Sequence, residues 1–242
     1  MRTMELEQGF RLELVVSEPD VQSPVAMEID EDGRLFVVEM PGYPLDVSPS
    51  GKVKLLEDGD GDGRFERVTV FADRLVLPTG VMRWKKGVLV TAAPDVLYFE
   101  DTDGDGRADV RKVVLTGFAR SNPQHTVNSP LYGLDNWVYV AHQGPAGAVI
   151  YKELFGDRGR PLTFPDAPDR APVDPKDSTV RFRPDTFEAE AIGGESQYGH
   201  TFDAYGRYFG NDNSHHLWHQ VIEARYLQRN PHLLVRRVMH DV

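Results

Sequence analysis

The chain has 242 residues, 40% of them hydrophobic and 27% charged, and its formal net charge is −11. This length fits one β domain or two small ones with a sizeable core, and the acidic balance argues against free nucleic acid or an anionic membrane surface as a partner. The chain contains no cysteine, which excludes disulfides, thiolate metal sites and a covalently attached c-type haem within it.

No apolar run in the sequence approaches the roughly 18 residues of a membrane span, so we expect no membrane-spanning helix. The N-terminal stretch MRTMELEQGF lacks the apolar core of a signal peptide. The protein is therefore expected to be either cytoplasmic, or exported with a signal that this sequence does not contain.

Short apolar runs separated by turn residues follow one another along the chain. Residues 10–16 (FRLELVV) predict a first strand, and a turn-rich stretch comes after it. The runs VAMEID and LFVVEM then flank an Asp-Gly tip, which predicts a β-hairpin. VKLLE and RVTVFAD follow on either side of an acidic stretch, which completes a unit of four short strands.

The same order of strands recurs three more times. The hairpin tips Asp32-Gly33, Lys86-Gly87, Asp135-Asn136 and Tyr205-Gly206 each mark one unit. Units of about 40–50 residues with four strands predict an all-β protein, a β-propeller of four-stranded antiparallel blades whose first strand is innermost.

The predicted blades of this single domain cover residues 24–73, 78–117, 126–193 and 197–242. We expect an insertion at residues 144–177 to run over the surface, and only residues 217–227 carry a weak helix signal.

Two arrangements of these blades are open. In one, residues 10–16 supply an outer strand to a last blade and close a ring of about four blades. In the other, the chain is the front part of a six-bladed or larger ring, which would leave sheet edges and apolar blade faces uncovered.

Two acidic stretches, EDGDGDGRFE at 57–66 and EDTDGDGRAD at 100–109, occupy the same place in neighbouring units. Both fit the pattern D-x-D-x-D-G-x-x-[DE], which offers three carboxylates, a backbone carbonyl and a further acid to a hard cation. The predicted ligands are Asp58, Asp60, Asp62, Arg64 (carbonyl) and Glu66 in one loop, and Asp101, Asp103, Asp105, Arg107 (carbonyl) and Asp109 in the other.

These loops differ from EF-hands, because the twelfth position holds Thr69 or Lys112 instead of glutamate and strands flank both. They resemble the hairpin calcium loops of integrin α-subunit propellers. We interpret them as two structural calcium sites; the alternative is a pair of acidic, solvated turns.

Propeller geometry separates the connections into two faces. The acidic loops and the hairpin tips share one face, whereas the second-to-third and blade-to-blade connections lie on the other. Five of the eight histidines are predicted on this second face: His125, His142, His200, His215 and His216. We therefore expect any ligand site there, at the mouth of the central channel.

His125 is the candidate general base, because histidine can take up a proton near neutral pH. Arg120, Gln124 and Asn128 surround it in sequence and could hold an anionic cofactor or an oxyanion. The alternative is that these histidines have no catalytic role and only line a polar, water-filled channel.

Long motifs in the sequence resemble a known family. SPVAMEIDEDGRLFVVEMPGYP, LLEDGDGDGRFERVTVFAD and SNPQHTVNSPLYGLDNWVY are similar to the N-terminal propeller of the planctomycete-type membrane-bound dehydrogenases, also called haem-binding CxxCH proteins. That propeller is in turn similar to the soluble glucose and sorbosone dehydrogenases, which are six-bladed, calcium-dependent quinoproteins.

The resemblance implies roles for particular residues. His125 matches the histidine that abstracts the hydroxyl proton of the sugar while pyrroloquinoline quinone takes the hydride. The segment GGESQYGHTFDAYGRYF matches the blade that carries a cofactor-clamping arginine, where this chain has Tyr198-Gly199-His200, so His200 is the candidate cofactor-binding residue there. A periplasmic or extracellular location and a cytochrome c-type electron acceptor are also implied.

The predicted function is thus a calcium-stabilised, sugar or polyol dehydrogenase-like propeller that oxidises an alcohol with a quinone-type cofactor. One alternative is a non-catalytic propeller that binds a glycan or a protein. The other is a metal-dependent, lactonase-type hydrolase with Glu28, Glu195, Asn128 and Asn211 as oxygen ligands in the channel.

Overall fold

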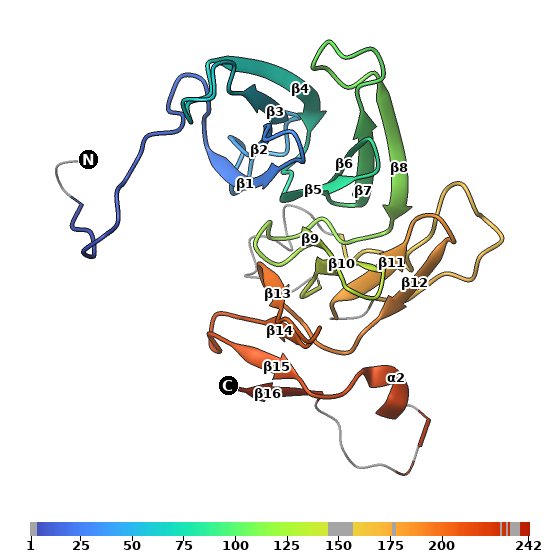
Figure 1. Ribbon diagram of the computed structural model, residues 1–242. Coiled ribbons are helices and arrows are strands. Elements are labelled where there is room, and N and C mark those ends of the chain that lie inside the picture. Colours follow the sequence, from blue (N-terminus) through green and yellow to red (C-terminus); the bar gives the residue numbers. More distant parts are fainter. Residues whose placement is uncertain (1–3, 145–156, 176–177, 228, 231, 233–237) are drawn as a thin grey trace.

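The computed structural model describes residues 4–144, 157–175, 178–227, 229–230, 232 and 238–242. These residues form four antiparallel four-stranded sheets, the blades of a β-propeller, which confirms the predicted fold class (Figure 1). Blade 1 contains β1 (Pro24–Ile29), β2 (Leu35–Glu39), β3 (Gly51–Glu57) and β4 (Arg67–Leu75); blade 2 contains β5 (Gly80–Trp84), β6 (Gly87–Ala92), β7 (Asp95–Glu100) and β8 (Val110–Thr116). Blade 3 contains β9 (Asn128–Tyr132), β10 (Val138–Ala141), β11 (Val180–Arg183) and β12 (Glu188–Ala191); blade 4 contains β13 (His200–Phe202), β14 (Tyr208–Gly210), β15 (Trp218–Gln220) and β16 (Met239–Asp241).

Hydrophobic side chains fill the space between neighbouring sheets. Phe36 and Val38 of β2 pack with Val88 and Val90 of β6 in one cluster between blades 1 and 2. Similar clusters lie between blades 2 and 3 and between blades 3 and 4. The middle strands β2, β6 and β10 are buried at every position, as expected for strands covered on both faces.

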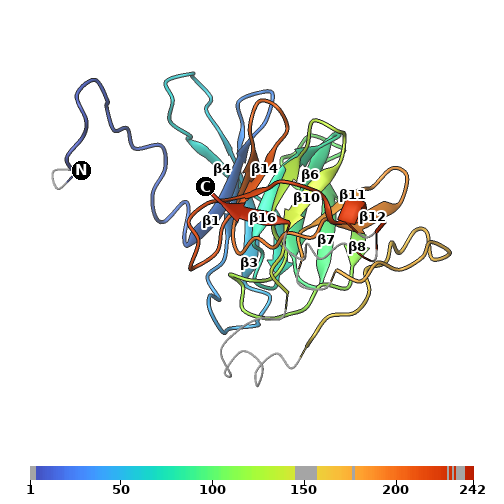
Figure 2. The ribbon, with the colours of Figure 1, turned by 90° about the horizontal axis from the view of Figure 1, so that it is seen from below.

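The connections between strands fall on two opposite sides of the propeller. Figure 2 shows the β3–β4 connection and the β13–β14 turn on one side of the sheets and the β2–β3 connection on the other. We call the first side the loop face and the second the channel-mouth face.

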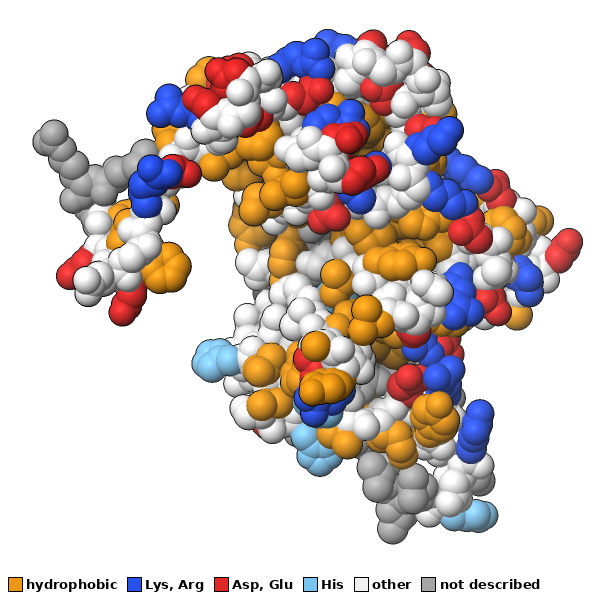
Figure 3. All heavy atoms as spheres, in the orientation of Figure 1, with side chains coloured by type: hydrophobic (Ala, Val, Ile, Leu, Met, Phe, Trp, Pro, Cys, Tyr) orange, Lys and Arg blue, Asp and Glu red, His pale blue; other side chains and the backbone are white. Residues whose placement is uncertain are grey.

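The N-terminal segment differs from the prediction, because residues 10–16 form no strand. The alternating side chains of Phe10, Leu12 and Leu14 are 74%, 41% and 54% exposed, and the arm stands clear of the body (Figures 1 and 3). It pairs with no strand among the described residues. Only the C-terminal end of this segment is held in place, where Val16 and Val21 pack on the side of blade 1 that faces away from blade 2.

The described part of the insertion, residues 157–175, is more than the surface excursion that was predicted. Leu162 and Phe164 are 2% and 4% exposed and join the cluster between blades 2 and 3. The backbone bridge Thr116–Thr163 attaches the segment to the outer strand of blade 2, and the bridge Leu162–Val173 joins two parts of the segment itself. Residues 145–156 and 176–177 of the predicted insertion lie outside the described residues.

The weak helix signal at residues 217–227 is largely wrong. Trp218, 1% exposed, lies in β15 between β14 and β16, and only α2 (Ala224–Leu227) is helical. Packing of Trp218 in the core outweighs local helix propensity. None of the described helices is long and apolar enough to cross a membrane.

Candidate functional site

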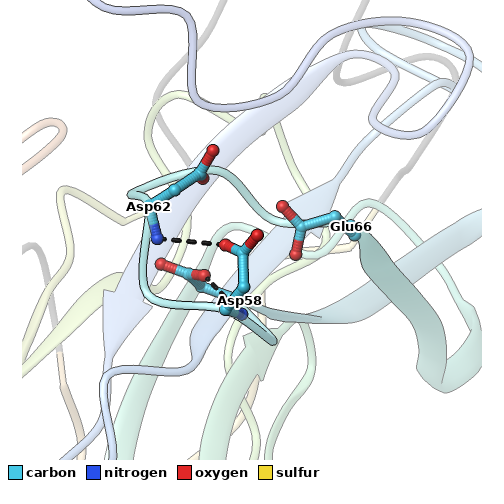
Figure 4. Close-up of side chains that lie close together, drawn as sticks. Asp58, Asp62 and Glu66 are labelled. Carbon is cyan, nitrogen blue, oxygen red and sulfur yellow. Dashed lines mark hydrogen bonds between the residues drawn. The ribbon is translucent and has the colours of Figure 1, made fainter.

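The first acidic loop, between β3 and β4, brings its carboxylates together. Asp58, Asp60, Asp62 and Glu66 each place one oxygen within 4.8 Å of the others, and Figure 4 shows three of these side chains close together in the loop. Ca²⁺ holds its oxygen ligands at about 2.3–2.6 Å, so two ligands of one ion lie up to about 5 Å apart. The separations therefore suit a single calcium ion.

The second acidic loop, between β7 and β8, folds in the same way. Asp58 accepts backbone hydrogen bonds from Gly61 (2.6 Å) and Gly63 (2.9 Å), and Asp101 accepts them from Gly104 (2.7 Å) and Gly106 (2.8 Å). The equivalent glycines have nearly equal positive φ values, +80° for Gly61 and Gly104, and +88° and +84° for Gly63 and Gly106. Glycine is needed there because other residues rarely adopt this conformation.

The two loops differ in their surroundings and in one ligand. Asp101, Asp103 and Asp109 form the acidic group of the second loop, whereas Asp105 is not part of it. The backbone of the second loop also reaches blade 1, since Ala108 N donates to Phe71 O (2.8 Å). The second loop therefore joins two blades.

The carboxylates that open both loops are stabilised in their charged form. Donation from Gly63 N, with smaller contributions from other loop amides, lowers the pKa of Asp58 below its usual value. Partial burial raises the pKa of Asp101, but the amides of Gly106 and Gly104 outweigh this effect and the net pKa is lowered. Both loops thus present ionised oxygens at neutral pH.

A cavity of about 430 Å³ opens on the channel-mouth face. Segments far apart in the chain converge on it: the start of β1, the β2–β3 connection, the connections into blades 3 and 4, and the β14–β15 connection. The side chains around it are apolar, aromatic or amide-bearing, and none of its described lining residues is charged: Val25, Met40, Tyr43, Pro123, Gln124, Gln197, Tyr198 and Asn213.

His125 follows the lining residues Pro123 and Gln124 in the chain but is not itself one of the residues that line this pocket. Its half-buried ring contacts the side-chain amide oxygen of Gln143 through Nδ1. An amide oxygen only accepts, so Nδ1 carries the proton and Nε2 keeps the lone pair that a general base requires. Among the described residues, Nε2 has no hydrogen-bonding partner.

The two predicted residues before His125 face solvent. Gln124 Nε2 donates to the hydroxyl of Tyr43 (2.7 Å), which joins the connection into blade 3 to the β2–β3 connection. The backbone N of Arg120 donates to Asp157 (3.0 Å), while its guanidinium has no hydrogen bond or ion pair within the described part of the chain. Arg120 lines a small cavity that shares Pro123 with the larger pocket.

Asn128, a predicted cofactor-binding residue, makes its hydrogen bonds within the protein. It is fully buried, and its side chain donates to the carbonyls of Thr126 and Gln197 (both 2.8 Å) and accepts from Gly199 N (3.1 Å). Its amide group is therefore committed to the backbone leading into blade 4. The sequence alone could not predict these backbone hydrogen bonds, because a polar residue at the start of an innermost strand can face either the channel or the next blade.

His200 is also held within the protein. Nε2 donates to Ser129 O (2.7 Å), which leaves neutral Nδ1 to accept from the hydroxyl of Tyr208 (2.7 Å). Burial lowers the pKa of His200 to about 4, although the bond to Ser129 opposes the shift. The ring is therefore neutral at neutral pH and positions blade 4 against blade 3.

His200 should make stability depend on pH. Its folded pKa of about 4 lies below the ordinary value of 6.5, so its contribution is complete above pH 6.5 and is lost as the pH falls toward 4. The loss is about 3 kcal/mol, or about 6–12 °C in Tm. Melting curves of the wild type and His200→Gln between pH 7.5 and 4 should show that the wild type loses more. Parallel curves for the two proteins would contradict this assignment.

Glu28 and Asn211, two of the oxygen ligands in the hydrolase alternative, have hydrogen-bonding partners within the protein. Glu28, in β1, accepts from the backbone N of Arg83 (3.3 Å), and burial raises its pKa despite that bond. Asn211 donates to the carbonyls of Tyr198 and Gly199 (3.2 and 3.4 Å). The two acidic loops contain the only acidic or histidine clusters of metal-binding size among the described residues, so Glu28 and Glu195 belong to none.

Three residues of this face contribute in ways that the sequence did not show. Gln143 fixes the tautomer of His125 from 18 positions away. Tyr43 is joined to Gln124, and the Tyr198 hydroxyl donates to Thr79 O on blade 2 (2.8 Å). Their place on the channel-mouth face could be predicted from the repeat, but these pairings have no local signal.

Comparisons with known proteins place the chain among propellers. A family model described as a domain of unknown function, DUF7133, matches residues 1–242, and no curated protein matches. The holo form of the PQQ domain of pyranose dehydrogenase from Coprinopsis cinerea is similar in structure, with a TM-score of 0.58, 13% identity, and coverage of 98% of this chain and 51% of that one. This likeness supports the propeller fold, and the chain spans about half the length of that domain.

Two further solved structures match with lower scores. An oxidoreductase (glucose dehydrogenase) from Thermus thermophilus has a TM-score of 0.45 and 18% identity, with 83% of this chain and 61% of that one covered. A protein from Lactobacillus plantarum has a TM-score of 0.38 and 10% identity, with 84% and 71% covered.

Proposed function

Because the chain belongs to the DUF7133 family and folds as a propeller, we propose that it is a calcium-stabilised, sugar or polyol dehydrogenase-like protein that works at the mouth of its central channel. One observation supports the proposal: a pocket of about 430 Å³ opens on the channel-mouth face, and His125, whose tautomer is fixed by Gln143, directly follows two of its lining residues in the chain. A base beside a pocket of small-molecule size is the arrangement that proton abstraction from a bound alcohol requires.

The pocket suits a neutral, hydroxyl-rich molecule. The amides of Gln124, Gln197 and Asn213 can both donate to and accept from hydroxyl groups, and Tyr43 and Tyr198 add aromatic surface. None of the described lining residues would hold a charged substrate. The proposed substrate class is therefore a sugar or polyol.

The residues present also fit a quinone cofactor. Tyr43, Met40 and Pro123 supply apolar and aromatic surface for a flat ring system, and Arg120, which lines the adjoining small cavity, would pair with a carboxylate of the cofactor. Gln124 would donate to a quinone or carboxylate oxygen. Pyrroloquinoline quinone, when bound, would accept the hydride of the alcohol.

The role of the chain itself is to bind the alcohol and to remove its hydroxyl proton. Nε2 of His125 takes the proton, and the positive charge that then develops on the ring is stabilised by the amide oxygen of Gln143. Asn128 and His200 act at a distance, because they fix the backbone that carries Tyr198 into the pocket.

The acidic loops complete the proposal. We assign one structural calcium ion to each, with Asp58, Asp60, Asp62 and Glu66 in the first and Asp101, Asp103 and Asp109 in the second. The carbonyls of Arg64 and Arg107 and the carboxylate of Asp105 are further proposed ligands. A periplasmic or extracellular location and a cytochrome c-type electron acceptor fit such an activity and are part of the proposal.

Cofactor binding gives a direct test. We expect pyrroloquinoline quinone, added with Ca²⁺, to bind the protein and to support reduction of a dye by glucose or sorbitol. Arg120→Ala should weaken quinone binding about tenfold or more, because an ionic hydrogen bond is lost. Arg74→Ala, which removes an exposed arginine of β4, is the matched control and should leave affinity unchanged.

The same experiment separates the alternatives. Sugar binding without quinone binding or dye reduction would replace the dehydrogenase with a non-catalytic glycan-binding propeller. Hydrolysis of a lactone by the metal-loaded protein would favour the hydrolase.

A further inference from the structure

The N-terminal arm, residues 4–15, is rich in exposed hydrophobic side chains. Met4, Leu6, Phe10 and Leu14 are between 47% and 74% exposed. Figure 3 shows hydrophobic side chains of this arm in open space, away from the body of the propeller. Soluble proteins rarely leave apolar surface of this extent uncovered unless a partner binds it. The arm is therefore a candidate contact surface.

The backbone of the arm is also unpaired. Residues 11–15 make no backbone hydrogen bond with any of the described residues, and Val16, which follows the arm, packs against blade 1. The side chains of Arg11 and Glu13 contact each other, as side chains two residues apart do on one face of an extended chain. The arm thus has the free backbone groups of a strand that lacks a neighbour.

The side chains of the arm alternate in a pattern that is complementary to itself. In a strand, Phe10, Leu12 and Leu14 share one face, and Arg11 and Glu13 share the other. Two copies that pair antiparallel with their Leu12 residues opposite each other also bring Phe10 opposite Leu14. The same register places Arg11 of each copy opposite Glu13 of the other, so the ion pair occurs twice about the two-fold axis.

Other registers of the same ribbon place like charges together. Centring the antiparallel pair on Arg11 would set two arginines opposite each other, and centring it on Glu13 would do the same with two glutamates. A parallel pair in register would repeat both conflicts. Opposite charges across two strands stabilise their pairing, whereas like charges directly opposite weaken it. The charge pattern therefore favours the antiparallel ribbon centred on Leu12.

Blade 1 offers apolar surface to the hydrophobic face of such a ribbon. Met27 and Ile29 of β1 are 68% and 62% exposed. They lie opposite Val37 and Leu35 in the sheet, and these two residues pack in the cluster that Val16 joins. Met27 and Ile29 are therefore on the side of blade 1 from which the arm extends. A two-stranded ribbon alone is marginal in water, and packing on this surface would stabilise it.

We propose that the arm is a dimerisation strand: two copies of this chain pair their arms as an antiparallel ribbon centred on Leu12 and pack it against blade 1. A second copy is the occupant because Arg11 and Glu13 give the arm both halves of its own charge pattern. The arm of one copy is then the neighbouring strand that the other lacks. None of these residues lines the pocket on the channel-mouth face, so the contact does not depend on a reaction there.

Sedimentation velocity over a range of protein concentrations tests the proposal. The wild type should form a reversible dimer, and Arg11→Glu and Glu13→Arg should each weaken it about tenfold or more, because two attractive pairs become repulsive. The variant with both substitutions should regain the dimer, and so should an equimolar mixture of the two single variants. Lys86→Glu, which makes the same charge change at an exposed lysine of the β5–β6 turn, is the matched control and should dimerise like the wild type.

The arm variants should fold normally, because the side chains of Arg11 and Glu13 are 83% and 61% exposed. Equal melting temperatures of the monomeric species check this. A wild type that stays monomeric at every concentration would overturn the proposal, whether the arm is free or folds back on its own chain. A dimer that neither single substitution weakens, or that their mixture does not restore, would assign the contact to another surface and also overturn it.

Discussion

Replacing His125 with alanine is expected to lower the rate of alcohol oxidation by the quinone-loaded protein about 10²–10⁴-fold, the usual contribution of a general base. The reason is that Nε2, the atom that would take the hydroxyl proton, disappears, while Gln124, Tyr43 and Tyr198 still form the pocket. Steady-state kinetics should show the loss in kcat with little change in KM. His216→Ala, an exposed histidine on the same face, is the matched control and should keep full activity.

Gln143 gives the same prediction a second readout. Gln143→Leu removes the acceptor that holds the proton on Nδ1 of His125, so kcat should fall about tenfold and the pH profile of kcat should change shape. Gln143→Glu keeps an acceptor oxygen and adds negative charge, which favours the protonated ring and should move the low-pH limb of the profile to higher pH. Full activity in His125→Ala would remove His125 from the proposed mechanism.

Removing calcium is expected to lower Tm by about 10 °C or more. When the free calcium concentration is about 100 times the Kd of a site, binding at that site adds about 2.7 kcal/mol to the free energy of unfolding. Each kcal/mol corresponds to about 2–4 °C in Tm for a protein of this size. Without the ion, clustered carboxylates such as Asp58, Asp60 and Asp62 repel one another. Calorimetry with and without a calcium chelator measures the shift, and Asp60→Ala combined with Asp103→Ala should reproduce it.

The two loops should not contribute equally. The second loop is bonded to blade 1 through Ala108 N and Phe71 O, and Gly106 packs beside Thr69 of β4. Asp103→Ala should therefore cost more stability than Asp60→Ala. If neither the chelator nor the variants changed Tm, the loops would be solvated turns without a metal.

The blades and their loops could be predicted because their signals are local. An Asp-Gly tip fixes a hairpin, and the alternation of aspartate and glycine specifies the hydrogen bonds from Gly61 and Gly63 to Asp58 within a single short loop. The fold class and the position of both acidic loops follow from such signals and from their recurrence.

The remaining features depend on residues that meet only in the folded chain. Leu162 and Phe164 lie in a proline-rich stretch that is typical of a surface segment, yet blades 2 and 3 bury them. Residues 10–16 have the alternation of a strand, but a strand also requires a neighbouring edge. The pairing of His125 with Gln143 joins two loops, and no periodicity in the sequence marks it.

One hydrogen bond at the channel mouth affects how the whole chain should unfold. Tyr198, which leads into blade 4, donates to Thr79 at the start of blade 2, and Asn128 links blade 3 to the same segment. In repeat proteins, stability is roughly a sum over units and their nearest neighbours. A contact that skips one unit breaks this additivity, so blades 2, 3 and 4 are expected to melt in a single cooperative transition. Deleting blade 4 together with Tyr198 would then weaken blade 2, because the bond to Thr79 would be lost.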